Sequence, residues 1–198
     1  NKLKNKAQSN QDDTIIGAYA LVKEVCIRKL KISPFDVQII GAIALDKGKM
    51  IEMQTGEGKT LVAVFAAYLN SLKENSVHIL TFNDYLAKRD AAWMSPIYDF
   101  LGLSVGYINE GMSLEQKRKA YGCNITYAPA KEVGFDYLRS MIAYNSNERV
   151  TQSFNYAIVD EADAILIDEA RNPLVLAGNL IESNINFKQV AGFAATLN

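Results

Sequence analysis

The segment Met53–Thr60 constrains the fold of this chain more than any other, because it is rich in glycine and ends in Gly-Lys-Thr. A loop of this kind follows a strand and opens a helix, and its backbone N–H groups point at phosphate oxygens. The lysine neutralises phosphate charge, and the threonine hydroxyl ligates Mg²⁺. The flanks agree, since residues 49–53 predict a short strand and residues 61–69 a buried helix. The segment therefore predicts a phosphate-binding loop rather than a chance glycine-rich turn.

A second motif, Tyr156–Asp163, lies about a hundred residues further along the chain. In it an apolar strand runs directly into two adjacent carboxylates, Asp160 and Glu161. In proteins that transfer phosphoryl groups, the first acid holds Mg²⁺, and the second orients and deprotonates the attacking water. The alternative is a helix N-terminus decorated with acids, which the helix dipole favours. The predicted catalytic residues are Lys59, Asp160 and Glu161, and the predicted Mg²⁺ ligands are Thr60 and Asp160.

Composition limits the class of protein. The 198 residues are 49% hydrophobic and 22% charged, which supports one sizeable core, and the net charge of −1 lacks the basic excess of a dedicated nucleic-acid-binding module. Cys26 and Cys123 are isolated and suit a reduced compartment. The single histidine, His78, sits in an apolar stretch and is expected to be structural. With no signal peptide and no apolar run near the ~20 residues that span a bilayer, we expect a cytoplasmic protein.

Strands and helices alternate along the rest of the chain. The predicted strands cover residues 49–53, 77–82, 104–108, 124–128, 154–159 and 174–177. The predicted helices cover residues 14–30, 36–46, 61–72, 84–101, 113–121 and 131–142. Such alternation predicts a three-layer α/β/α domain with a mainly parallel sheet. The ligand is then expected beyond the carboxyl ends of the strands, where both motifs lie.

Two residues upstream of the loop suggest how a base could be held. Phe35 and Gln38 lie about twenty residues before Lys59. A glutamine amide presents a donor and an acceptor in one plane, which matches N6 and N7 of adenine, and phenylalanine can stack on the purine. An ordinary helix start with a buried Phe35 fits the spacing equally well. The predicted nucleotide-binding residues are Phe35, Gln38, Thr55, Gly56, Glu57, Gly58, Lys59, Thr60 and Leu61.

Together these stretches resemble the SecA family of preprotein translocase ATPases over nearly all of residues 14–178. The matching stretches are residues 34–38, 52–61, 83–90, 93–94, 134–139, 159–163 and 165–173. The most specific are Gly-Phe-Asp-Tyr-Leu-Arg and Ile-Leu-Ile-Asp-Glu-Ala-Arg, which ordinary helicases lack. Met53 stands where the strict phosphate loop has glycine, a variant common in helicase-like motor ATPases.

The resemblance implies the first nucleotide-binding domain of a SecA-like motor, a RecA-like, DEAD-like P-loop NTPase domain. It implies ATP or ADP and Mg²⁺ as cofactors, with Gln38 reading adenine, the loop from Gly56 to Thr60 wrapping the phosphates, and Asp160 and Glu161 handling Mg²⁺ and water. The implied partners are a second RecA-like motor domain, a preprotein substrate and a Sec-type membrane channel, with peripheral contact with the membrane. Because an arginine finger would come from the second domain, the isolated chain is expected to hydrolyse ATP poorly.

The resemblance leaves the roles of two arginines and of the chain's end open. Arg139 and Arg171 are either coupling partners of the acidic motif or members of structural surface pairs. Residues 1–13 are a polar start, residues 14–178 the nucleotide-binding domain, and residues 179–198 a remnant of a connection to an insertion or second motor domain. Residues 191–196 resemble a degenerate family motif, so either the family's preprotein-binding insertion is absent or the chain is trimmed.

Three local departures suggest a divergent or accessory member of the family. Gln54 stands where the family usually has a basic residue, residues 128–131 replace a more polar segment, and Ala162 replaces the usual valine.

Two other functions remain as alternatives. A DEAD-type nucleic-acid helicase fragment is disfavoured because Asp84, after the strand at 77–82, would repel phosphate. A non-hydrolysing nucleotide-binding relict is disfavoured because Lys59, Thr60, Asp160 and Glu161 are all intact.

Overall fold

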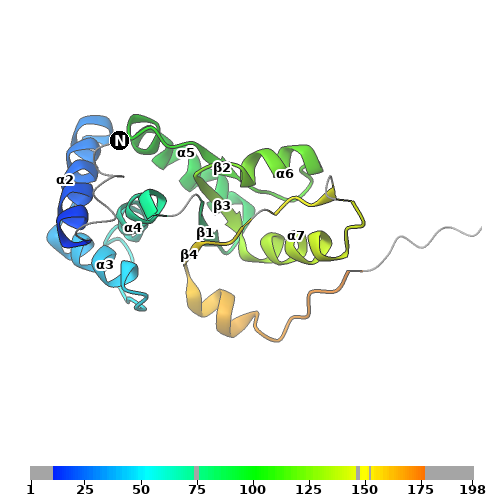
Figure 1. Ribbon diagram of the computed structural model, residues 1–198. Helices are drawn as coiled ribbons and strands as arrows, with labels where there is room; N and C mark the ends of the chain where they lie inside the picture. Colours follow the sequence, from blue (N-terminus) through cyan, green and yellow to red (C-terminus); the bar gives the residue numbers. More distant parts are fainter. Residues whose placement is uncertain (1–10, 74–75, 146–147, 152, 177–198) are drawn as a thin grey trace, which may run out of the picture.

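Four parallel strands form the centre of the molecule (Figure 1). The computed structural model describes residues 11–73, 76–145, 148–151 and 153–176. The strands are β1 (Val77–Thr81), β2 (Val105–Tyr107), β3 (Ile125–Pro129) and β4 (Tyr156–Val159), in the order β2-β3-β1-β4. In the centre of the sheet Ile79 of β1 lies between Tyr127 of β3 and Ile158 of β4. All three pairings are parallel, which confirms the predicted mainly parallel α/β fold.

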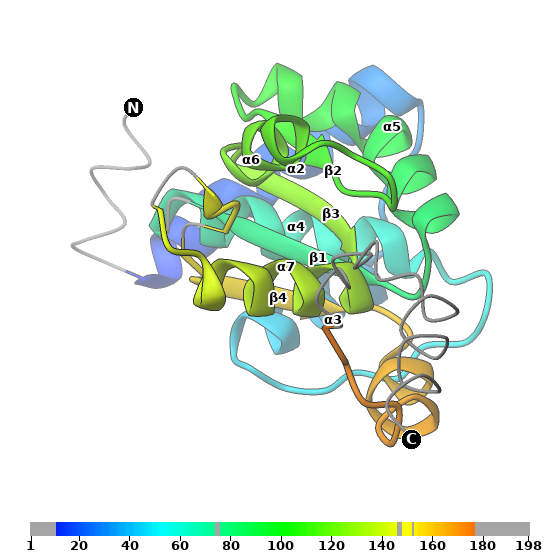
Figure 2. The same ribbon diagram turned by 90° about the vertical axis from the view of Figure 1, so that its right-hand side faces the viewer.

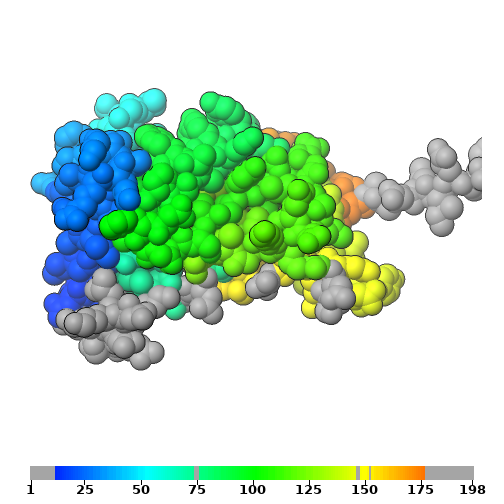
Figure 3. Space-filling model, turned by 90° about the horizontal axis from the view of Figure 1, so that it is seen from above, coloured from blue at the N-terminus to red at the C-terminus, as the bar shows by residue number. Residues whose placement is uncertain are grey.

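Helices cover both faces of this sheet. The helices are α2 (Gln11–Leu30), α3 (Asp36–Asp46), α4 (Lys59–Lys73), α5 (Asp84–Phe100), α6 (Leu114–Tyr121) and α7 (Ala130–Ile142), followed by a short π-helix, η2 (Ala164–Asp168). Helices α4 and α5 lie on one face, and α6 and α7 on the other (Figures 1 and 2). Helix α2 forms an outer layer that packs against both α4 and α5, and α3 packs against α4. Figure 3 shows α2 at one end of the molecule, in blue. No helix in the described part of the chain is both long and apolar enough to cross a membrane.

Local polar contacts explain where two of the helices begin. Asn83 caps α5, because its side-chain oxygen accepts the Leu86 N–H at 2.9 Å. Ser113 caps α6 through a reciprocal box with Gln116, in which the Ser113 N–H donates to Gln116 Oε1 at 2.9 Å. Helix α5 is followed by Gly102, whose positive φ of 77° suits glycine at a helix end.

Helix α4 carries most of the core on its side of the sheet. Ten of its fifteen residues are buried, which confirms the buried helix that the sequence predicted here. Phe65 of α4 meets Tyr19 of α2 edge-on, with ring centroids 5.4 Å apart. Because α4 is locked between the sheet and α2, its first residues are held in a fixed place.

Two predicted strands are wrong. Residues 49–53 form no strand, although Ile51 and Met53 pack inward while Met50 and Glu52 face solvent. The side chains therefore alternate between core and solvent without any strand pairing. The Met53 carbonyl instead accepts a hydrogen bond from the Lys59 ammonium at 3.3 Å. Residues 174–176 form no strand either, and Ala177 lies outside the described residues.

The helix predicted at 14–30 begins earlier, at Gln11, within the predicted polar start. The segment 191–196 and the predicted remnant 179–198 also lie outside the described residues.

His78 lies in β1 as expected and is 3% exposed. Its ring contacts Tyr121 and Phe154, with centroids 5.9 and 5.2 Å away, and its Nδ1 has no hydrogen-bond partner among the described residues. Burial lowers the pKa of His78, because an apolar surrounding disfavours the charged imidazolium.

We therefore expect acid to destabilise the fold through His78. In the unfolded chain His78 takes up a proton with an ordinary pKa of ~6.5, whereas in the folded chain its pKa is lower. The free energy of unfolding is therefore unaffected by His78 above that pH and decreases as the pH falls below it. The loss is at most about 1.4 kcal/mol per pH unit. Urea unfolding from pH 7.5 to 5.5 should show a steeper loss for the parent than for His78→Phe, and equal slopes would contradict this.

Candidate functional site

The glycine-rich loop leads directly into the N-terminus of α4. In a parallel sheet the connecting helix runs back against the strands, so the beginning of α4 lies at the carboxyl edge of β1 (Figure 2). Gly56 and Gly58 have positive φ values of 92° and 77°, which glycine adopts at low cost. The Glu57 N–H donates to the Gln54 carbonyl at 3.2 Å, and this hydrogen bond closes a turn from Gln54 to Glu57. The loop thus ends at the first N–H groups of α4, which is where a helix offers backbone donors to an anion.

The predicted loop side chains divide into exposed and anchoring ones. Lys59 is exposed, and its ammonium folds over the loop to donate to the Met53 carbonyl. Thr60 is half-buried, Thr55 is exposed, and Leu61 is only 5% exposed because it belongs to the core. The Lys59 side chain is therefore accessible to solvent, whereas Leu61 anchors the start of α4 in the core.

Gln38 ties the base of α3 to this loop. It is 4% exposed; its Oε1 accepts the Phe35 N–H at 2.9 Å, and its Nε2 donates to the Glu57 carbonyl at 2.7 Å. A Cβ on Gly58 would overlap with the Gln38 amide nitrogen, so only glycine allows this approach. Phe35 is 71% exposed, which excludes the alternative of a buried aromatic at an ordinary helix start. The structure thus brings Phe35, Gln38 and the loop together.

The two acids follow β4 at the same edge of the sheet. The Asp160 N–H donates to the Leu80 carbonyl at 2.9 Å, which places Asp160 beside the end of β1. Glu161 has a φ of 52°, unusual for a residue with a side chain, and its N–H donates to Asp160 Oδ1 at 3.0 Å. Strained residues of this kind cluster at functional sites. The strain turns Glu161 away from the strand direction and leaves its carboxylate exposed.

Arg89 of α5 is electrostatically coupled to this acidic turn. Its Nε donates to the buried carboxylate of Asp90 at 2.8 Å, and that hydrogen bond is the main cause that raises the pKa of Arg89. The negative charge of Asp160 adds to the increase in the Arg89 pKa. Lys59 and Arg89 carry positive charge, and the side chains of Asp160 and Thr60 carry oxygen atoms of the kind that Mg²⁺ prefers.

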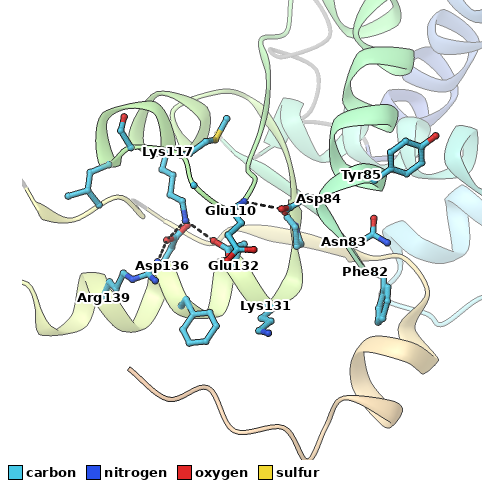
Figure 4. A pocket seen from close by; sticks show the side chains of 16 residues that line it. Phe82, Asn83, Asp84, Tyr85, Glu110, Lys117, Lys131, Glu132, Asp136 and Arg139 are labelled. Atoms are coloured by element: carbon cyan, nitrogen blue, oxygen red, sulfur yellow. Dashed lines mark hydrogen bonds and ion pairs between the residues drawn. The ribbon is translucent and has the colours of Figure 1, made fainter. Parts of the chain in front are cut away.

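A cavity of about 830 Å³ lies further along the same edge (Figure 4). Segments that follow three different strands line it: residues 82–85 after β1, 110–114 after β2 and 129–139 from the end of β3 into α7. The Asp84 carboxylate accepts the Glu110 N–H at 3.1 Å and so fixes the first two walls to each other.

A buried ionic cluster forms one wall of this cavity. The Lys117 ammonium donates to Glu132 and Asp136, each at 2.8 Å, and Asp136 is fully buried. Asp136 also accepts from Tyr121 at 3.1 Å and from Arg139 at 3.2 Å. Arg139 thus pairs with Asp136, three residues earlier on α7, and a coupling role for this arginine stays a prediction. For Arg171 no ion pair is present among the described residues.

None of the sequence motifs pointed to this cluster. Its signal was the four-residue spacing of Glu132 and Asp136, which places both carboxylates on one face of a helix. Nothing in the sequence assigned Lys117 on α6 to that face, because the two helices meet only in the folded chain.

Comparison with known proteins decides the family. The model of the SecA DEAD-like domain matches residues 1–198. The chain belongs to the SecA DEAD-like domain family. This confirms the resemblance and the RecA-like fold, and it does not favour the nucleic-acid helicase alternative.

Relatives of this SecA DEAD-like domain come from distant organisms. A protein translocase subunit SecA of Caldicellulosiruptor saccharolyticus is 53% identical over 186 residues, covering 94% of this chain and 22% of the relative. That of Rubrobacter xylanophilus is 54% identical over 167 residues, covering 84% and 18%. A chloroplastic SecA subunit of Ostreococcus lucimarinus is 48% identical over 185 residues, covering 93% and 20%. The chain thus spans about a fifth of the length of its curated relatives.

Replacing Lys117 should destabilise the domain strongly. Lys117→Met leaves the buried Asp136 carboxylate without its ammonium partner, which typically costs about 3–5 kcal/mol. Lys119→Met removes an exposed lysine of the same helix and should change the free energy of unfolding by less than ~0.5 kcal/mol. Urea unfolding measures both, and an equal cost for the two variants would show that the cluster is not a stabilising unit.

Glycine at position 161 should relieve backbone strain. Glu161→Gly is expected to leave the fold as stable or up to about 1 kcal/mol more stable, because glycine adopts positive φ without the steric cost. The matched change Ala164→Gly, in η2, should cost about 1 kcal/mol instead. Thermal unfolding of both variants tests this, and a comparable loss from Glu161→Gly would mean that position 161 is not strained.

Proposed function

We propose that this SecA DEAD-like domain binds ATP with Mg²⁺ and forms one half of the hydrolytic site of a protein-translocation motor. The observation that carries the proposal is the convergence of two chemistries at one sheet edge. A phosphate loop opens α4, and a strained acidic turn follows β4 beside the end of β1. Phosphate binding and water activation require this pairing of groups.

Each residue has a distinct role in the proposed reaction. Bound ATP and Mg²⁺ supply the phosphoanhydride bond and the charge that polarises it. The backbone N–H groups from Gly56 to Thr60 hold phosphate oxygens, and the Lys59 ammonium offsets their charge. Thr60 and Asp160 hold the metal ion, while Glu161 orients the attacking water and accepts its proton at a carboxylate oxygen. Phe35 and Gln38 form the base side of the site.

The rest of the reaction needs groups outside this chain. Phosphoryl transfer in motors of this type uses an arginine finger that is worth roughly 10³–10⁵ in rate. We assign that arginine to a second RecA-like domain that faces the same sheet edge. The proposed partners of the whole motor are a preprotein substrate and a Sec-type membrane channel, because the relatives are named protein translocase subunits.

Removing the loop lysine should weaken nucleotide binding. In calorimetric titration of ADP and Mg²⁺, Lys59→Ala should bind about tenfold or more weakly than the parent, because a charge-assisted contact with phosphate is lost. Lys49→Ala is the matched control, since Lys49 is an exposed lysine just before the loop, and it should bind as the parent does. Hydrolysis by the parent alone should be slow, and Glu161→Gln should abolish what remains.

Three results would contradict the proposal. They are no binding by the parent, equal binding by Lys59→Ala, or fast turnover by the parent without a second domain. Salt-sensitive RNA binding that stimulates ATP hydrolysis would instead support a nucleic-acid helicase.

A further inference from the structure

The Glu57 N–H, carbonyl and one carboxylate oxygen all make hydrogen bonds that hold the glycine-rich loop. Its N–H donates to the Gln54 carbonyl at 3.2 Å, and its carboxylate Oε2 accepts the Gln54 N–H at 2.8 Å. Its own carbonyl accepts the Gln38 amide at 2.7 Å, across nineteen residues of sequence. Glu57 therefore closes one turn of the loop twice, with backbone and side chain, and connects that turn to α3.

A carboxylate at this position has an electrostatic cost. Phosphate groups carry negative charge, and a nearby carboxylate repels them. A direct contact between Glu57 and phosphate is thus unfavourable, so any benefit from this side chain has to act through the loop. Gly56 and Gly58, on either side of Glu57, have positive φ values, and glycine has more backbone freedom than any other residue. The loop therefore needs hydrogen bonds that hold its conformation, and Glu57 supplies them.

We propose that Glu57 is a positioning residue that preorganises the phosphate loop and links it to the base side of the site. The two hydrogen bonds between Gln54 and Glu57 hold this turn closed. Gly56 and Gly58 then keep their positive φ values, and the N–H groups that follow stay directed at phosphate. The link through Gln38 connects this geometry to Phe35, whose N–H is bonded to the same amide. This role rests on the proposed function of the site.

Two substitutions of Glu57 separate the effect of its hydrogen bond to Gln54 from the effect of its negative charge. Glu57→Gln keeps an oxygen that can accept the Gln54 N–H but removes the negative charge. Glu57→Ala removes both. If the brace matters, the loop of Glu57→Ala samples many conformations, and a nucleotide binds only the fraction that is correctly arranged.

The first test measures the affinity for ADP and Mg²⁺ together with the association and dissociation rates. Titration of ADP and Mg²⁺ into the full 198-residue chain should show about tenfold weaker binding for Glu57→Ala, with a slower association rate and a little-changed dissociation rate. Glu57→Gln should restore binding to the parent level or better, because it retains the acceptor without the repulsion. Glu52→Ala, which removes an exposed carboxylate just before the loop, is the matched control and should bind as the parent does.

A second readout does not depend on nucleotide. In ligand-free protein, hydrogen exchange at the Gln54 N–H should be about tenfold faster or more in Glu57→Ala than in the parent, and nearly unchanged in Glu57→Gln. Faster exchange with unchanged binding would overturn the positioning role while leaving the proposed function intact. Tighter binding by Glu57→Ala would also overturn it, because the carboxylate would then act only as a repulsive charge. No binding by the parent would overturn the proposed function and this role together.

Discussion

The parallel pairing of β1 with both of its neighbours is the constraint on which the rest of the molecule depends. Because β3, β1 and β4 run in one direction, the segments that follow them all emerge at one edge of the sheet. Helix α4 runs the opposite way and brings the glycine-rich loop to that same edge. The loop, the acidic turn and the cavity walls come from distant parts of the sequence, and the common direction of strands and helices brings them to one edge of the sheet.

The geometry of the candidate site depends on hydrogen bonds to the backbone rather than on hydrogen bonds between the candidate side chains. Asp160 is placed by its N–H on the Leu80 carbonyl, and Gln38 is placed by backbone groups at Phe35 and Glu57. The accessible groups, Lys59 and Glu161, are left to project from this frame. Such a division suits a site that has to exchange ligands, since the frame stays in place while the exposed groups change partners.

The sequence predicted the parallel strands β1 to β4 and the six helices because their periodicity reflects local burial. It failed at residues 49–53 and 174–176, where apolar alternation or a short apolar run occurs without strand pairing. The motifs located the loop and the acids, but not the tie between Gln38 and Glu57 or the positive φ of Glu161. Those features, like the contact of Lys117 with Asp136, arise only when separate elements meet, and no local pattern encodes them.

The segment that follows the acidic turn comes back across α7. At Gly134 a Cβ would overlap with the Leu174 side chain, so the hydrogen atom of glycine sets the spacing between two segments forty residues apart. In terms of sequence variation, these two positions are not independent. A larger residue at position 134 therefore obliges the partly exposed Leu174 side chain to turn aside, whereas a smaller residue at position 174 would leave it room without any such movement.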